Sequence, residues 1–310
     1  MTSASEKNDS TRFAEGMLLA TTLIWGGTFG ATKLLVGGDL GPVGLLAWRF
    51  GIATLCLLPL FLIGRIRVDR ATLRLGLVLG LLLYAGFGLQ TVGLVETTSS
   101  RSGFITALYV IFTPLLQPLF GRRRPDLSIW IGVFIVMAGL WMLTGAGSLA
   151  SLNTGDLLTL GCALSFAVYI VVLDLYGSDR ETLPLTFVQL AVVAVLALLH
   201  RPFVEEWVVP SGNQSWMLLL YLALLATVFT TWAQTKFQPQ TTPSRAAIIF
   251  TMESVFAAAI GALLLGEHLG TIEWIGGGLI VVGLLVVELM PGKRRTTDAT
   301  SDQQATAGRE

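Results

Sequence analysis

Apolar residues run along this chain in unbroken blocks of about 20 positions and do not alternate with polar residues. A helix of that length crosses roughly 30 Å of hydrocarbon, so each block predicts a membrane-spanning helix. The connections between the blocks are short and leave no room for a soluble domain. We expect ten spans, at about 14–36, 42–64, 73–95, 102–121, 127–146, 155–176, 183–201, 215–236, 243–265 and 271–290.

The polar flanks, residues 1–13 and 291–310, lack helical periodicity, and we expect both to be disordered tails. The chain is 53% hydrophobic and 13% charged, whereas an ordinary soluble domain is about 25% charged. Its net charge is zero, so electrostatics do not favour nucleic acid as a partner. The pattern predicts an all-α, multi-pass membrane protein embedded in a lipid bilayer.

Lysine and arginine predict how the chain is oriented. With the N-terminus in the cytoplasm, sixteen of these residues fall in cytoplasmic segments and two, Arg101 and Arg201, fall in outer loops. Such a bias is the positive-inside pattern. We therefore expect both termini to be cytoplasmic.

An internal repeat divides the spans into two halves. At a constant offset of 144 residues, several positions of 99–140 recur in 243–284. The identical pairs are Ser100 and Ser244, Arg101 and Arg245, Trp130 and Trp274, Gly132 and Gly276, and Gly139 and Gly283. A weaker match pairs Trp25 with Phe166. We expect two five-helix halves, 14–146 and 155–290. Because five is odd, the halves have inverted topology, as is typical of secondary transporters.

This organisation resembles the drug/metabolite transporter superfamily, and most of all the EamA-type ten-helix exporters of bacterial inner membranes. The segments that carry the resemblance are "IWGGTFGATK" in the first span, "WRF" in the second and "ESVFAAAIGALLLGEHLGTIEWIGGGLIVVGLL" near the end. Family members often have proline after the glutamate of the ninth helix, whereas Ser254 follows Glu253 here. A kink at that position is therefore absent or made differently. The resemblance implies a secondary transporter that exports small metabolites such as amino acids, by alternating access.

Polar and aromatic side chains form stripes along single faces of several spans. The stripes are Thr21, Trp25, Thr28 and Thr32; Ser102, Thr106, Tyr109, Thr113 and Gln117; and Thr227, Thr231, Gln234 and Gln238. Serine and threonine can also bond their own helix backbone or a neighbouring helix. We expect the transport pathway to include Trp25, Arg49, Tyr84, Gln90, Tyr109, Gln117, Tyr169, Thr231, Trp232, Gln234 and Glu253. Among these, Trp25, Tyr109, Gln117, Trp232 and Gln234 are predicted to meet around one cavity near the bilayer midplane.

Three charged side chains fall within predicted spans. Lys33 lies near the outer end of its span, where its stem can reach the interface. Arg49 lies deeper and requires an anion, backbone carbonyls or water. Glu253 lies at the centre of its span, where a carboxylate costs roughly 2.5–3.5 kcal/mol. It is either a structural carboxyl, a proton-coupling site or part of the substrate site; in the repeat register its counterpart is Tyr109.

No constellation of residues predicts an enzyme, a cofactor or a metal site, since Glu253 is the one acid near a span centre and both histidines lie near span ends. A channel rarely requires inverted halves that meet at a midplane site. The other transporter hypothesis is an antiporter or facilitator of phosphorylated compounds or nucleotide sugars. Those anions call for clustered basic residues, of which the spans offer Arg49 and Lys33. A neutral, aromatic-rich lining fits an amino-acid-like or aromatic metabolite better, with protons as the possible coupling partner.

Overall fold

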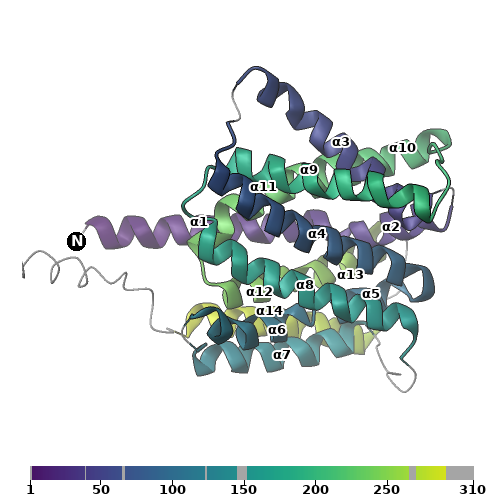
Figure 1. Ribbon diagram of the computed structural model, residues 1–310. Helices are drawn as coiled ribbons and strands as arrows, with labels where there is room; N and C mark the ends of the chain where they lie inside the picture. Colours follow the sequence, from purple (N-terminus) through teal and green to yellow (C-terminus); the bar gives the residue numbers. More distant parts are fainter. Residues whose placement is uncertain are drawn as a thin grey trace, which may run out of the picture.

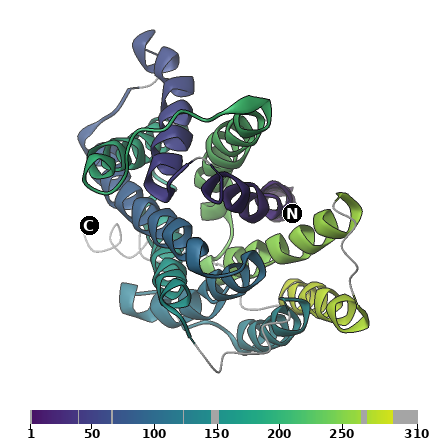
Figure 2. The ribbon, with the colours of Figure 1, turned by 90° about the vertical axis from the view of Figure 1, so that its right-hand side faces the viewer.

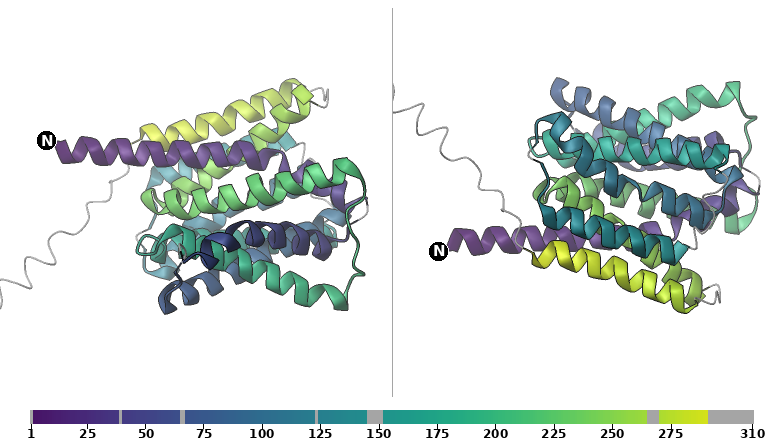
Figure 3. Two further views of the ribbon diagram at one scale, coloured as in Figure 1. Left: turned by 90° about the horizontal axis from the view of Figure 1, so that it is seen from above. Right: turned by 90° about the horizontal axis from the view of Figure 1, so that it is seen from below.

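A computed structural model describes residues 2–38, 40–64, 67–122, 124–144, 152–264 and 270–290. In these ranges the regular structure is helical throughout, and the helices run roughly along one direction as a bundle (Figures 1 and 3). Nine helical stretches of the described chain are long and apolar enough to cross a membrane. The prediction of an all-α, multi-pass membrane protein is therefore confirmed.

The first apolar block differs from its prediction, because it does not form one spanning helix. α1 (Thr2–Gly26) ends before Gly27, and α2 (Thr28–Val36) completes the block. The phenol of Tyr221 donates a hydrogen bond to the Ile24 carbonyl at this break, where a helix end leaves carbonyls without intrahelical donors. Residues 2–13, which we expected to form a disordered tail, belong to α1 in the structure. Adding residues to an existing helix is much easier than nucleating one. The predicted tail 291–310 lies outside the described residues.

The remaining helices follow the predicted blocks closely. The first half of the chain continues with α3 (Pro42–Leu62), α4 (Arg70–Glu96), α5 (Ser99–Thr106), α6 (Tyr109–Leu116), η1 (Gln117–Phe120) and α7 (Leu127–Thr144). The second half contains α8 (Thr154–Tyr176), α9 (Thr182–His200), η2 (Arg201–Phe203), α10 (Gly212–Leu220), η3 (Tyr221–Phe229), α11 (Thr230–Phe237), η4 (Gln238–Gln240), α12 (Pro243–Phe250), α13 (Met252–Leu264) and α14 (Thr271–Leu289).

Several spans are interrupted near their middles. The fourth block breaks at Ala107 and Leu108, between α5 and α6, and the ninth breaks at Thr251, between α12 and α13. The eighth passes through η3, a π-helical stretch between α10 and α11. The ninth span is therefore interrupted just before Glu253, although Ser254 stands where family members often have proline. Interruptions inside a membrane are tolerated where the freed backbone is buried in protein or lines a cavity.

Glycines bring α7 and α14 together along one edge of the bundle, as Figure 2 shows from one end. A Cβ on Gly139 would lie 2.6 Å from the Gly276 carbonyl oxygen, and one on Gly283 would lie 3.0 Å from that of Gly132. Small residues allow such close backbone approach between membrane helices. The glycines that repeat at the offset of 144 residues are thus the ones at this interface.

Candidate functional site

A cavity of about 60 Å³ lies among the interrupted helices and has room for several water molecules. Its lining comes from both halves of the chain. The lining residues are Trp25, Thr28, Arg49, Leu83, Phe87, Gln90, Thr106, Tyr109, Phe166, Tyr169, Ile170, Gln234, Phe250 and Glu253.

Several polar side chains that line this cavity lie next to the helix breaks. Tyr109 is the first residue of α6, and Thr106 is the last residue of α5. Glu253 lies in the first turn of α13, where the helix dipole favours a negative charge. Tyr109 and Glu253, which the sequence repeat pairs at an offset of 144 residues, both line the cavity.

Arg49 projects from α3, and η3 holds its guanidinium. Its Nε donates to Thr227 Oγ1 at 2.7 Å, and its Nη2 donates to the Ala226 carbonyl at 3.0 Å. The guanidinium carbon also lies 4.7 Å from the centroid of the Phe87 ring, a cation–π distance. Thr227 in turn donates to the Leu222 carbonyl, five residues earlier, so the π-helical turn orients the hydroxyl that receives Arg49. These contacts use only part of the five donors of the side chain.

Glu253 is the acidic side chain among the residues that line the cavity in the described chain. Within the part of the chain that the structure describes, its carboxylate has no hydrogen-bond or salt-bridge partner, and Arg49 is the cation that acts on it electrostatically. The cavity therefore contains one cation with donors to spare and one carboxylate open to a ligand, a proton or water.

Amide and hydroxyl groups extend this polar environment into the packed helices. Gln90 Nε2 donates to Thr106 Oγ1 at 3.1 Å, and the Tyr169 phenol donates to Gln189 Oε1 at 2.7 Å. Gln234 Nε2 donates at 2.9 Å to Oε1 of Gln238, the next buried amide along that stripe. Cavity-facing amides are thereby held in defined orientations before any ligand binds.

Of the eleven residues predicted for the pathway, seven line the cavity: Trp25, Arg49, Gln90, Tyr109, Tyr169, Gln234 and Glu253. The other four lie elsewhere among the described residues. Tyr84 bonds His200 Nδ1 at 2.6 Å, and Gln117 donates to Ser244 Oγ between η1 and α12. Thr231 is buried in α11, and the Trp232 ring packs on Phe229 and Phe237. Of the five residues expected to meet, Trp25, Tyr109 and Gln234 do so.

Lys33 also lies apart from the cavity lining, and its ammonium bonds the carbonyls of Leu94 and Thr97 at 2.5 and 2.9 Å. We expected the Lys33 side chain to reach toward the membrane interface, and in the structure its ammonium group binds carbonyls at the C-terminal end of α4. Arg49 is the one basic residue among those that line the cavity in the described chain.

The apolar residues that line the cavity were not among the residues predicted for the pathway. Phe87, Phe166 and Phe250 line it, and the Trp25 ring meets the Phe250 ring edge to face at 5.3 Å between centroids. Thr28 and Thr106, which also line the cavity, are members of the predicted polar stripes. The sequence repeat pairs Phe166 with Trp25 but does not mark it as a cavity residue. An apolar residue in an apolar span otherwise carries no signal that separates a cavity wall from a lipid-facing surface.

Known proteins resemble this chain along most of its length. The model of the EamA-like transporter family matches it twice, at residues 12–145 and 153–289. An uncharacterized transporter of Archaeoglobus fulgidus is 31% identical over 89% of this chain and 86% of its own length. The uncharacterized inner membrane transporter YedA of Escherichia coli is 29% identical over 88% of this chain and 90% of its own length.

The threonine/homoserine exporter RhtA of Escherichia coli is 30% identical over 86% of this chain and 87% of its own length. A solved crystal structure, 19% identical, superposes with a TM-score of 0.74 and covers 90% of this chain and 99% of that one, which shows the shared fold. Family model, relatives and helical bundle agree, and this chain belongs to the EamA-like transporter family.

Proposed function

We propose that this protein is a secondary transporter that exports zwitterionic, amino-acid-like metabolites across a bacterial inner membrane by alternating access. The observation that carries the proposal is the pair of opposite charges in the cavity, Arg49 and Glu253. An α-amino acid presents a carboxylate and an ammonium group a few bonds apart. The carboxylate would bind the unused donors of Arg49, and the ammonium would bind Glu253.

The aromatic walls of the cavity add no charge and suit an apolar or compact side chain. A phosphorylated compound or nucleotide sugar fits less well, because its phosphate would bind one arginine while facing the carboxylate of Glu253. The name of RhtA, a threonine/homoserine exporter, supports the amino-acid class. The relatives are transporters, so the family favours transport over catalysis.

For the architecture we propose ten spans in two inverted five-helix halves, 14–146 and 155–290. Three observations support this. The family model matches each half separately. The helix breaks at 107–108 and 251 are related by the repeat offset of 144. The α7–α14 glycines pair reciprocally, Gly132 with Gly283 and Gly139 with Gly276, as two-fold-related helices require. The positive-inside bias supports cytoplasmic termini.

The test is counterflow of radiolabelled L-threonine in liposomes that contain the purified protein. Unlabelled L-threonine and L-homoserine should compete for uptake. N-acetyl-L-threonine, which lacks the ammonium group, and L-threonine amide, which lacks the carboxylate, should compete at least about tenfold more weakly, since each loses a charged hydrogen bond. Equal competition by either blocked compound would contradict recognition of a zwitterion. Counterflow supported by a sugar phosphate but by no amino acid would favour the phosphorylated-compound antiporter.

A further inference from the structure

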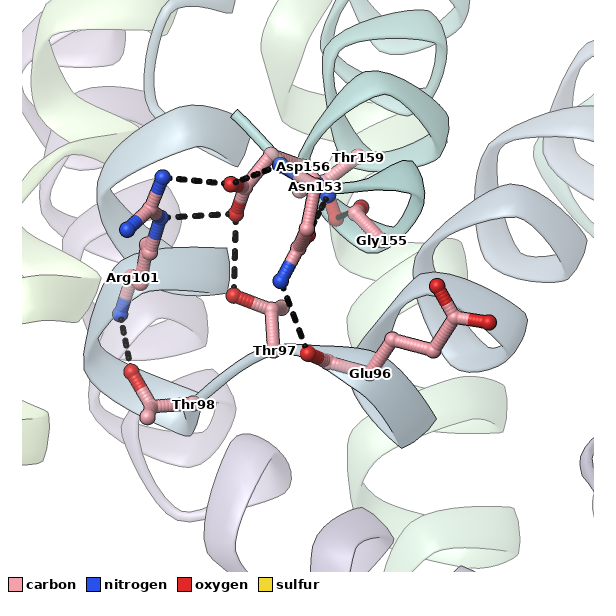
Figure 4. Close-up of polar contacts among 8 residues, drawn as sticks. All are labelled: Glu96, Thr97, Thr98, Arg101, Asn153, Gly155, Asp156 and Thr159. Carbon is pink, nitrogen blue, oxygen red and sulfur yellow. Dashed lines mark hydrogen bonds and ion pairs between the residues drawn. The ribbon is translucent and has the colours of Figure 1, made fainter. Parts of the chain in front are cut away.

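A dense polar cluster surrounds Asp156 at the end of the bundle that lies on the right in Figure 1, where α4 turns into α5 and α8 begins. Figure 4 shows its parts. The carboxylate, whose side chain is 0% exposed, forms an ion pair with Arg101 Nη2 at 2.5 Å. It also accepts hydrogen bonds from Arg101 Nε at 2.8 Å, Thr97 Oγ1 at 2.9 Å and the Asn153 backbone N–H at 3.0 Å.

One five-residue segment of this cluster recurs in the sequence, with four of its five residues identical. Residues 97–101 read TTSSR, and residues 241–245, at the repeat offset of 144, read TTPSR. In both segments the second threonine caps the helix by accepting from the arginine backbone N–H, at 3.2 Å for Arg101 and 3.3 Å for Arg245. The same local structure is therefore built twice.

The contacts made by the two segments are equivalent as well. Thr97 Oγ1 donates to Asp156, and its counterpart Thr241 Oγ1 donates to Glu15 at 2.7 Å. Asp156 begins the first helix of the second half, and Glu15 lies on the first helix of the first half. Each segment thus joins the fourth helix of its own half to the first helix of the other half. In Figure 1 the second junction, where α12 and the C-terminal end of α14 meet α1, lies at the opposite end of the bundle from the first.

The two junctions differ in the number of carboxylates that their arginines contact. Arg101 binds Asp156 through two nitrogens. Arg245 is shared: its Nη1 lies 3.0 Å from Glu288 Oε2 but 3.6 Å from Glu15 Oε1. Its Nη2 donates to the Val287 carbonyl at 3.0 Å, so the guanidinium sits mainly on α14.

Separation of the helices would have different consequences at the two ends. Moving α8 away from α5 would break both Arg101 contacts and the Thr97 hydrogen bond with Asp156 at once, and breaking a buried ion pair is strongly unfavourable. Moving α1 away from α12 would leave Arg245 paired with Glu288 and Val287. The Glu15 side chain is 11% exposed, against 0% for Asp156, and the nearby hydrogen bond from Ser10 to Gln240 is exposed.

We propose that the two TT-x-SR segments are a duplicated pair of clasps with unequal roles in the transport cycle. The Asp156 clasp is a fixed joint that stays closed. The Glu15 clasp is releasable: when α1 separates from α12, Arg245 gives up Glu15 and keeps Glu288. Glu15, Thr241 and Glu288 are then positioning residues that set how readily this end of the bundle opens. The proposal requires a transporter that changes conformation and is independent of the substrate.

Ser244, which is 2% exposed and lies beside Arg245, accepts a hydrogen bond from Gln117 and provides a reporter for that opening. The experiment uses the full chain with both native cysteines replaced, Cys56→Ser and Cys162→Ser, and with Ser244→Cys as the single thiol. The rate of alkylation by N-ethylmaleimide and the Tm are measured in purified protein.

Glu15→Gln and Thr241→Val should accelerate alkylation about threefold or more, because each shifts the equilibrium toward the open state. Glu288→Gln should slow it, because Arg245 then has Glu15 as its one carboxylate partner in this cluster. The slower alkylation in Glu288→Gln does not follow from a merely structural role, because loss of a structural contact would lower Tm and would not protect Ser244→Cys.

The matched variants at the other clasp are Asp156→Asn and Thr97→Val. Both should lower Tm and leave the alkylation rate at the parent value. If Asp156→Asn does not fold, Thr97→Val, which removes one hydroxyl, provides the comparison with Thr241→Val. Equal acceleration by variants of both clasps would overturn the assignment of unequal roles. An unchanged rate in Glu15→Gln, or a faster rate in Glu288→Gln, would overturn the release of Arg245.

Discussion

Replacing Arg49 with lysine isolates the geometry of the guanidinium from its charge. Arg49 donates from Nε to Thr227 and from Nη2 to the Ala226 carbonyl, and these two bonds set how its remaining donors meet the cavity. Lysine keeps the positive charge opposite Glu253 but concentrates its donors on one ammonium group. It cannot hold η3 and present a planar pair of donors to a substrate carboxylate at the same time.

The expected loss can be estimated from these contacts. A hydrogen bond to a charged group contributes about 1.5–3 kcal/mol. If the lysine stays bound to Ala226 or Thr227, the substrate carboxylate loses at least one such bond. Since each 1.4 kcal/mol is about tenfold in Kd, L-threonine should bind roughly 10- to 150-fold more weakly. If the lysine turns to the substrate instead, the η3 contact is lost and the free energy of unfolding falls by a similar amount.

Binding of radiolabelled L-threonine and Tm, both measured on the purified protein, distinguish these effects. Arg201→Lys is the matched control, because Arg201 stacks on the Trp207 ring at 4.6 Å and does not line the cavity. That variant should bind threonine as the parent does. The reasoning is refuted if Arg49→Lys lowers Tm but leaves the Kd within about twofold of the parent. Arg49 would then be a structural tie to η3 and not a ligand for substrate.

Three further predictions follow from other parts of the molecule. Glu253→Gln should keep the fold but weaken threonine exchange as well as pH-driven net transport, because the substrate ammonium loses its carboxylate partner. Exchange that survives while pH-driven transport is lost would make Glu253 a proton-coupling site, and loss of neither would make it a structural acid. Gly139→Leu places a side chain against the Gly276 carbonyl, 2.6 Å from the position of its Cβ, and should cost about 1–3 kcal/mol, seen as a lower Tm; an unchanged Tm would contradict close packing of α7 on α14. Cysteine at exposed Asn213 should react with an impermeant thiol reagent added to intact cells, whereas cysteine at exposed Ser178 should react only after lysis; the reverse pattern would contradict cytoplasmic termini.

Local properties of the sequence were enough to predict the class of fold and the family. Block length, the scarcity of charge and the short connections all act along a single helix, so no tertiary information is needed to recognise spans. The repeat could also be recognised without tertiary information, because the same glycines and tryptophans recur in the sequence after 144 residues. Seven cavity residues were found because a polar or charged side chain in an apolar span stands out from its neighbours.

Polar character alone did not separate cavity from packing. Gln117 and Tyr84 looked like pathway residues, but Ser244 and His200, which are far away in the sequence, satisfy them. The apolar walls, such as Phe166 and Phe250, had no polar signal at all. Which of these alternatives holds depends on the neighbour that another helix supplies.

Sequence by itself therefore determined that this chain crosses a membrane repeatedly, as a transporter of this family does, because spans and repeats are properties of the chain read along its length. Tertiary structure alone decided where the helices break, that η3 receives Arg49, and that Arg245 is shared between two carboxylates. Each of these depends on groups that are distant in sequence and are brought within hydrogen-bond or ion-pair distance only when the helices pack. In lipid, a polar group gains most from a partner inside the protein, so that packing decides what each buried charge can do.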